Sequence, residues 1–299
     1  LICGDGGTVL EETALEDAEV ESTARETVRW RQLSKNETCR TLRTALALGD
    51  GHLIAAGDGG AVLHVEGESV RLRETPQQLR IHSLWGSSPR NVFAACDNAT
   101  ILHFDGNDWQ QVHRGGVDTA LLAIHGFGPH DIFAVGDDGY ALRHDGLMWR
   151  QLETGVKQEL YGLWGPDSQH LLAVGGGGLV LRWNGERWKP FNAGTDHDLY
   201  GATGSGLAKL FLCGLAGTLV RYEDNAWHRD FTGVRSDLHD LCRDEDVFYA
   251  VGSNGTILRN SDGLWEPEYS GVDGTLQAVA SHGGELFAVG SGGVVLKRE

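Results

Sequence analysis

The side chains in this sequence that could do chemistry fall into two recurring sets. The first contains aspartates that directly follow a short apolar run, and these are Asp5, Asp58, Asp97 and Asp137. The second contains aromatic and imidazole residues in the second position of another apolar run, and these are His82, Tyr161, Tyr200 and His239. Carboxylates attract a cation or a basic protein surface, and Tyr is favoured at the centres of protein interfaces. We therefore treat these eight residues as candidate partner-binding residues.

No catalytic or metal-binding pattern accompanies these residues. The thirteen His form no HxH or HExxH spacing, and the five Cys form no CxxC pair of the kind that holds structural zinc. A central catalytic site would need side chains from several repeats to converge, and its contributors would be His82, His125, His239, Tyr161 and Tyr200. The sequence predicts no metal, no cofactor and no enzymatic activity.

The charge balance excludes two classes of partner. With 42 acidic and 25 basic residues the formal net charge is −17, whereas a protein that binds nucleic acid replaces counterions with Lys and Arg. No apolar run approaches the roughly 18 residues that a membrane helix needs. The odd number of cysteines, without paired spacing, favours a reducing cytoplasm over a secreted disulfide framework. We expect a cytoplasmic protein that binds neither nucleic acid nor a membrane.

An internal repeat must position the candidate residues. A short apolar run, a turn rich in Gly, Asp, Asn and Ser, and a second apolar run recur eight times. The reference position at the turn is Gly4, Gly57, Cys96, Gly136, Gly175, Gly214, Gly252 and Gly290, with spacings of 53, 39, 40, 39, 39, 38 and 38 residues. Each copy reads as a β-hairpin, because these turn residues tolerate the positive φ of a tight turn.

Two further short strands flank each hairpin, one before it and one after it that contains a Trp in most units. Four short strands per unit of about 39 residues are typical of a β-propeller blade. We expect an all-β fold, one propeller domain over residues 1–299, with units at about 1–37, 43–78, 81–115, 121–155, 160–194, 199–233, 238–271 and 276–299.

The number of hairpins favours eight blades of four antiparallel strands, the two terminal blades having three. The alternative is seven blades, with the incomplete ends sharing one blade and one hairpin displaced. Residues 11–27 interrupt the first unit with seven acidic residues and one Arg, and we interpret them as a solvated acidic insertion. Loops of this kind on a rigid scaffold can also bind partners.

The link between the third and fourth strands has its own motif. It reads Asp105-Gly106-Asn107-Asp108-Trp109 in one unit and Asp145-Gly146-Leu147-Met148-Trp149 in the next. This resembles the Asp-box, or BNR, repeat of sialidase-like and photosystem II assembly-factor-like propellers. The resemblance implies a fold in which the Asp caps the turn and the Trp packs between blades. It does not imply catalysis, since the arginine triad and nucleophile pair of a sialidase are not recognisable.

Consecutive units are neighbours in a ring, so the four aspartates should line one half of a single rim. The His and Tyr residues should lie near the mouth of the central channel on the same face. We therefore expect a monomeric, non-catalytic scaffold or adaptor, of the kind found in bacteria, that presents an acidic loop-bearing face to a basic protein partner. The alternatives are a propeller lectin that uses exposed Trp residues and, less favoured, a lyase or hydrolase acting in the central channel.

Overall fold

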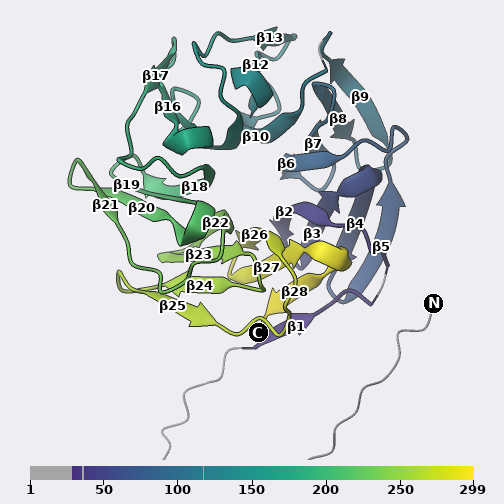
Figure 1. Cartoon of the computed structure of the whole chain (residues 1–299). Helices are drawn as coiled ribbons and strands as arrows, with labels where there is room; N and C mark the ends of the chain where they lie inside the picture. Colours follow the sequence, from purple (N-terminus) through teal and green to yellow (C-terminus); the bar gives the residue numbers. More distant parts are fainter. Residues whose placement is uncertain (1–28, 36, 117) are drawn as a thin grey trace, which may run out of the picture.

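Seven β-sheets surround a central axis in the computed structural model, which describes residues 29–35, 37–116 and 118–299 (Figure 1). Each sheet has four antiparallel strands, and the sheets are arranged like the blades of a propeller. The strands are short, three to eight residues long, and the described residues contain no α-helix, only short 3-10 turns. The predicted all-β single propeller is confirmed.

The first four blades follow the chain from inner to outer strand. Blade 1 is β2 (Leu42–Gly49), β3 (His52–Gly57), β4 (Ala61–Glu66) and β5 (Ser69–Glu74). Blade 2 is β6 (Ile81–Ser88), β7 (Asn91–Cys96), β8 (Thr100–Phe104) and β9 (Trp109–Arg114). Blade 3 is β10 (Leu121–Gly128), β11 (Asp131–Gly136), β12 (Ala141–His144) and β13 (Trp149–Gln151). Blade 4 is β14 (Leu160–Asp167), β15 (His170–Gly175), β16 (Val180–Trp183) and β17 (Trp188–Pro190).

The last three blades complete the ring. Blade 5 is β18 (Leu199–Gly206), β19 (Lys209–Gly214), β20 (Leu219–Glu223) and β21 (Ala226–Arg229). Blade 6 is β22 (Leu238–Asp244), β23 (Val247–Gly252), β24 (Ile257–Asn260) and β25 (Trp265–Glu268). Blade 7 is β26 (Leu276–His282), β27 (Glu285–Gly290), β28 (Val295–Arg298) and, as its outermost strand, β1 (Trp30–Gln32).

The preferred expectation of eight blades, with three-stranded ends, is wrong, and the alternative of seven is right. The ring closes because β1 pairs with β28, with Trp30 opposite Arg298 and Gln32 opposite Leu296. The number of hairpins is a poor guide to the number of blades here, because strands from both ends of the described chain form one sheet. Pairing of β1 with β28 covers an edge of each strand that would otherwise be unpaired. The first hairpin copy, at Leu1, and the acidic segment 11–27 lie outside the described residues.

The antiparallel order gives the ring two distinct faces. The upper face carries the turns between second and third strands and the links to the next blade. Five of its turns are η1 (Asp58–Gly60), η2 (Asp137–Gly139), η3 (Gly176–Gly178), η4 (Leu215–Gly217) and η5 (Ser291–Gly293), and turns 97–99 and 253–255 complete the set. The lower face carries the other two turns of each blade.

The hydrophobic core lies between neighbouring blades. Each second strand is buried along almost its whole length, as in β11, where only Asp131 is partly exposed. One cluster joins Ile54 and Ala56 of blade 1 to Val92, Ala94 and the Trp109 indole of blade 2. Burying side chains on both sides of every sheet leaves the turns and inner strand ends for function.

Candidate functional site

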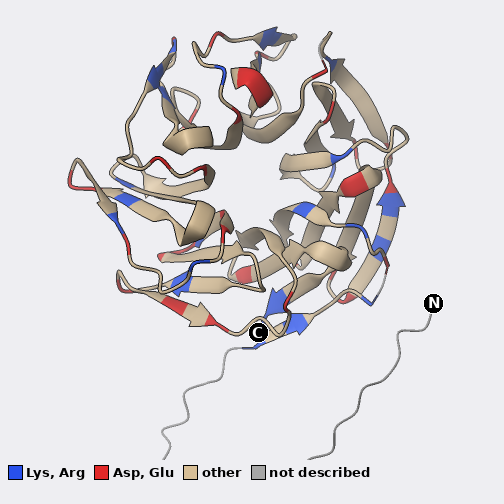
Figure 2. Cartoon of the chain, viewed as in Figure 1, with Lys and Arg blue, Asp and Glu red and all other residues tan. Residues whose placement is uncertain are grey.

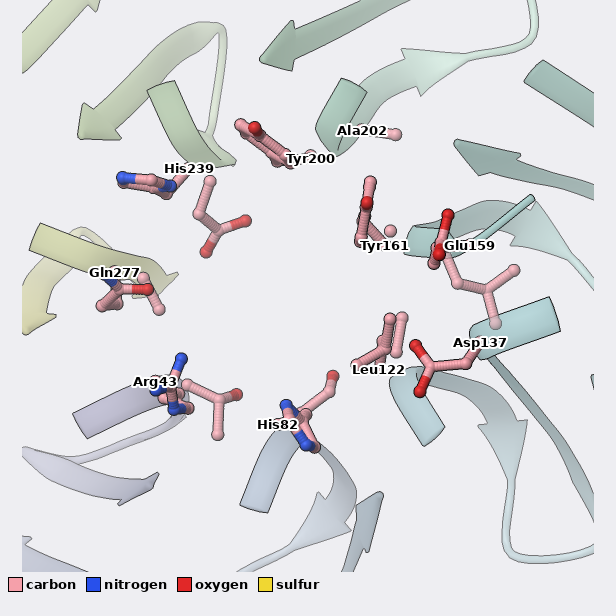
Figure 3. Close-up of a pocket in the computed structure, with 18 residues that line it drawn as sticks. Arg43, His82, Leu122, Asp137, Glu159, Tyr161, Tyr200, Ala202, His239 and Gln277 are labelled. Atoms are coloured by element: carbon pink, nitrogen blue, oxygen red, sulfur yellow. The ribbon is translucent and has the colours of Figure 1, made fainter. Parts of the chain in front are cut away.

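A cavity of about 590 Å³ occupies the upper mouth of the central channel (Figure 3). One side chain from each blade surrounds it, always the second residue of the inner strand. These residues are Arg43, His82, Leu122, Tyr161, Tyr200, His239 and Gln277. The structure therefore brings together all four of the His and Tyr residues that the sequence singled out.

A β-bulge aims each of these side chains. In all seven blades the inner strand skips one residue of its ladder directly after the first pair, as between Leu160 and Gly162 in β14. The skipped residue is the one that lines the mouth. Bulges often redirect a side chain next to a functional site, and here the same irregularity is repeated around the whole ring.

On one side of the mouth these side chains are tied to the upper turns. Arg43 Nε lies 2.6 Å from Asp58 Oδ1, and Arg80 Nε lies 3.0 Å from the same oxygen. His82 Nε2 lies 2.7 Å from Asp97 Oδ1. Burial acts to raise the pKa of Asp58, but the two arginines outweigh it and the pKa is lowered. The charge of Asp58 is therefore already compensated within the protein.

The tie recurs in blade 6, where His239 Nε2 lies 3.0 Å from Ser253 Oγ. A Ser–His contact could suggest a nucleophile and its base. It occupies the same two positions as Arg43–Asp58 and His82–Asp97, so we interpret it as the same contact between inner strand and turn. No group of three or more potential metal-ligating side chains occurs among the residues that the structure describes.

On the other side of the mouth, the residues at the equivalent positions do not form this contact between inner strand and turn. Gly176 and Leu215 stand where a turn partner for Tyr161 and Tyr200 would be, and apolar Leu122 leaves Asp137 without a mouth partner. The Tyr161 and Tyr200 ring centroids lie 5.4 Å apart at 64°, and the Tyr200 and His239 centroids lie 5.7 Å apart at 28°. Three rings thus form a continuous arc over blades 4, 5 and 6, which we call the aromatic arc.

Four carboxylates flank the aromatic arc, and we call them the acidic arc: Asp137, Glu159, Asp198 and Asp237. None of them has a Lys, Arg or His partner within 4.0 Å in the described part of the chain, in contrast to Asp58 and Asp97. Burial, followed by Glu159, Asp198 and Asp137, raises the pKa of Tyr161. Glu159 lies beside Tyr161, and Asp137 lies beside Leu122 (Figure 3).

Two members of the acidic arc also bridge blades. Asp198 Oδ1 accepts a hydrogen bond from Gly177 N at 2.7 Å, and Asp237 Oδ1 accepts one from Ala216 N at 2.8 Å. Each uses one carboxylate oxygen for this cap on the upper face. Many Lys and Arg residues lie instead on the outermost strands, blue on β5, β13 and β1 in Figure 2.

The aspartates predicted as one continuous acidic series are divided by the structure. Asp5 lies outside the described residues, Asp58 and Asp97 lie on the upper face but are tied, and Asp137 lines the cavity. Sequence reasoning missed Glu159, Asp198 and Asp237, which precede the inner strands. Their spacing of 39 residues each, directly before Leu-Tyr or Leu-His, was the available signal.

Asp240 lies deeper in the same cavity, where it joins blades 6 and 7. Its carboxylate accepts hydrogen bonds from Leu241 N at 2.8 Å and Val279 N at 3.0 Å. Burial raises the pKa of Asp240 to about 7 in spite of both hydrogen bonds. Thr44 and Ser83 make the same contact to the next inner strand in blades 1 and 2, so the position of Asp240 is structural.

The shifted Asp240 should make the fold less stable as pH rises. Because its pKa in the folded protein exceeds the ordinary 3.8, the stabilisation is complete below about pH 4 and is lost as pH rises through 7. We expect Asp240→Asn to flatten the decline of the melting temperature between pH 4 and 8, measured by calorimetry. The exposed Asp224→Asn is the control, and parallel profiles for Asp240→Asn and the wild type would contradict the assignment.

The Trp residues do not form a repeated sugar platform in the described residues. Trp109, Trp188 and Trp265 are 6%, 6% and 7% exposed, and Trp149 and Trp227 are half-buried against inter-blade clusters. A lectin of the kind considered from the sequence needs these indoles at the surface, so their burial counts against it.

Comparison with known proteins reveals the fold alone. No protein-family profile matches the chain, and no curated protein does. Among solved structures, one described as YCF48 bound to D1 peptide has a TM-score of 0.75 and 18% sequence identity. The match covers 91% of this chain and 94% of the chain in that structure. YCF48 from Cyanidioschyzon merolae has a TM-score of 0.73 and 17% identity, and covers 90% and 98%. The WD40 propeller domain of Doa1 has a TM-score of 0.76 and 12% identity, and covers 91% and 96%.

These similarities confirm the resemblance to photosystem II assembly-factor-like propellers at the level of the fold. In this chain, an aspartate caps the turn between the third and fourth strands of blades 2 and 3. Asp105 Oδ1 accepts hydrogen bonds from Asn107 N and Asp108 N, and Asp145 Oδ1 accepts them from Leu147 N and Met148 N. Among the described residues, no helix is both long and apolar enough to span a membrane.

Proposed function

We propose that this propeller is a non-enzymatic protein-binding module whose upper face engages a positively charged segment of a partner protein. The single observation that carries the proposal is the uncompensated acidic arc, which borders an aromatic-lined cavity on the same half of the ring. On the other half, Arg43 and Arg80 neutralise Asp58, and Asp97 is in contact with His82. The binding surface is therefore centred on blades 4, 5 and 6.

Electrostatics and shape both support this function. A formal charge of −17 steers a basic partner toward the protein, and the arrangement of carboxylates at the mouth then selects the docking face. Tyr161 and Tyr200 supply rigid, partly apolar contact area at the centre of that face, as interface hot spots do. The similar structure described as YCF48 bound to D1 peptide supports peptide binding by a protein of this fold.

Neutralising three of the four carboxylates of the acidic arc should weaken binding of the partner without unfolding the ring. The variant combines Glu159→Gln, Asp198→Asn and Asp237→Asn, in which the Asn side chains keep an oxygen for the caps on Gly177 and Ala216. We expect roughly a tenfold or larger loss of affinity, mainly as slower association, because each surface charge pair contributes up to about 1 kcal/mol. Surface plasmon resonance with the partner captured from native cells measures this.

The matched control removes the same number of charges from the opposite face of the same blades. It combines Glu186→Gln, Asp224→Asn and Glu245→Gln, all exposed side chains in lower turns. This control should bind the partner as the wild type does. Equal affinities for the acidic-arc variant and the wild type would refute the proposed function, as would equal losses in both variants.

A further inference from the structure

We propose that the upper mouth is a pocket for one inserted cationic side chain, an arginine or lysine of the partner, held between the aromatic and acidic arcs. This inference rests on the proposed function and specifies its central contact. Cations are attracted to the faces of Tyr rings, more strongly where water is excluded. The mouth combines such faces with carboxylates that have no basic partner in the described chain.

The ring geometry suits a flat or compact cation. Tyr161 and Tyr200 meet at 64°, so they form a corner, and the His239 ring extends the wall at 28° to Tyr200. Burial lowers the pKa of His239, which keeps its imidazole neutral near pH 7. The third ring therefore adds no positive charge to the wall that the cation would contact.

Close approach of neighbouring inner strands builds the corner. A Cβ on Gly162 would lie 2.6 Å from Tyr200 O, and a Cβ on Gly201 would lie 3.2 Å from Asp240 Cα. These glycines stand where Thr44 and Ser83 bridge other blades through a side chain. The missing side chain of Gly162 lets β14 and β18 approach, which brings the two tyrosine rings together, and that of Gly201 lets β18 and β22 approach.

The charged side chains around the corner of the two tyrosines are carboxylates, and the positively charged Arg43 lies across the cavity. After burial, the carboxylates of Glu159, Asp198 and Asp137 raise the pKa of Tyr161. Those of Asp198 and Asp237 raise the pKa of Tyr200 in the same way. Arg43 lies on the other side of the mouth (Figure 3), where its Nε is 2.6 Å from Asp58 Oδ1. An inserted cation is therefore directed to blades 4 to 6, away from Arg43, in a cavity of about 590 Å³.

Capped hexapeptides of Gly and Ser test the pocket, each with one central Arg, Lys, citrulline or norleucine. The readout is NMR of the full-length protein with ¹³C-labelled Tyr. Tyr161→Phe and Tyr200→Phe assign the two mouth signals, and the other four tyrosines serve as internal controls. We expect saturable shifts of the Tyr161 and Tyr200 signals with the Arg or Lys peptide, and no shift with citrulline or norleucine.

The comparison of peptides decides the chemistry. A larger shift with Arg than with Lys identifies guanidinium as the preferred group, and the reverse identifies ammonium. Equal shifts with citrulline, or no shift of Tyr161 and Tyr200 with any cationic peptide, would overturn the proposal. Shifts confined to Tyr269, which is 86% exposed, would overturn it as well.

The partner itself supplies a second readout that separates this inference from the proposed function. The double variant Tyr161→Ala, Tyr200→Ala should lower the affinity for the captured partner at least fivefold. Tyr269→Ala, which changes an exposed tyrosine, should leave the affinity unchanged. If the tyrosine variant binds the partner normally but the acidic-arc variant still binds it more weakly, the proposed cation pocket is wrong and the proposed function stands. If neutralising the acidic arc has no effect, the proposed function fails whatever the peptides show.

Discussion

Deleting residues 1–34 should lower the melting temperature by about 10 °C or more, because it removes the strand that closes the ring. Trp30 of β1 is 8% exposed, its Nε1 donates to Glu268 Oε2 at 3.0 Å, and Leu33 N donates to Val295 O at 2.8 Å. Loss of one buried Trp side chain alone costs about 3–5 kcal/mol. Deletion also exposes the edge of β28 and invites aggregation. Calorimetry and light scattering measure both effects.

Two further variants make this test specific. Deleting only residues 1–28 retains β1, so comparing this variant with the 1–34 deletion isolates the contribution of residues 29–34. Trp30→Ala should fall between the two deletions. If both deletions melted together, closure by β1 would contribute nothing measurable, and the account of blade 7 would be wrong.

Gly175→Ala should destabilise the protein by about 3 kcal/mol or more, measured by urea denaturation. A Cβ at this position would lie 1.9 Å from Glu159 O, and that backbone oxygen belongs to the link entering β14. Moving the link costs more than ordinary overpacking, which costs about 1–3 kcal/mol. The reference positions of the repeat are mostly glycine for this steric reason. In blade 2 this position is Cys96, which pairs with Thr100, and the reference glycines of blades 3 to 7 make the equivalent backbone contact four residues along the chain.

Gly177→Asn is the matched control, two residues further along the same turn. Gly177 has φ +64° and nothing within 4 Å of an added Cβ. Asn98 and Asn254 hold the same place in blades 2 and 6 with φ 58° and 57°. Asn tolerates this conformation, so we expect a change under about 1 kcal/mol. A larger loss for Gly177→Asn than for Gly175→Ala would contradict the steric explanation.

The repeat in the sequence was enough to predict the blade, but not how the ring closes. Apolar runs and turn glycines are local signals, and they recur wherever a blade recurs. Pairing of Trp30 with Arg298 joins residues at the two ends of the chain, and no local pattern marks it. The repeat places Trp30 in the first unit, at about 1–37, whereas the structure places it in the outermost strand of blade 7.

The candidate site could be predicted by position and only partly by charge. Tyr161, Tyr200, His82 and His239 occupy equivalent places in the repeat, so their convergence follows from the ring. Whether an aspartate is free depends on a partner that lies in the neighbouring strand or blade. Asp58 meets Arg43 and Arg80, which no spacing rule identifies. The acidic half of the mouth is therefore displaced toward Glu159 and Asp198.

Hydrogen exchange of the wild-type protein, free and with the partner captured from native cells, tests the central claim most directly. We expect slower exchange on binding in segments 156–162, 195–201 and 234–240, which carry the aromatic arc and, apart from Asp137, the acidic arc. The lower turns at 184–187, 223–226 and 243–247 should exchange at the same rate in both states. Protection confined to the lower turns or the outermost strands would place the partner elsewhere and contradict binding at the upper mouth.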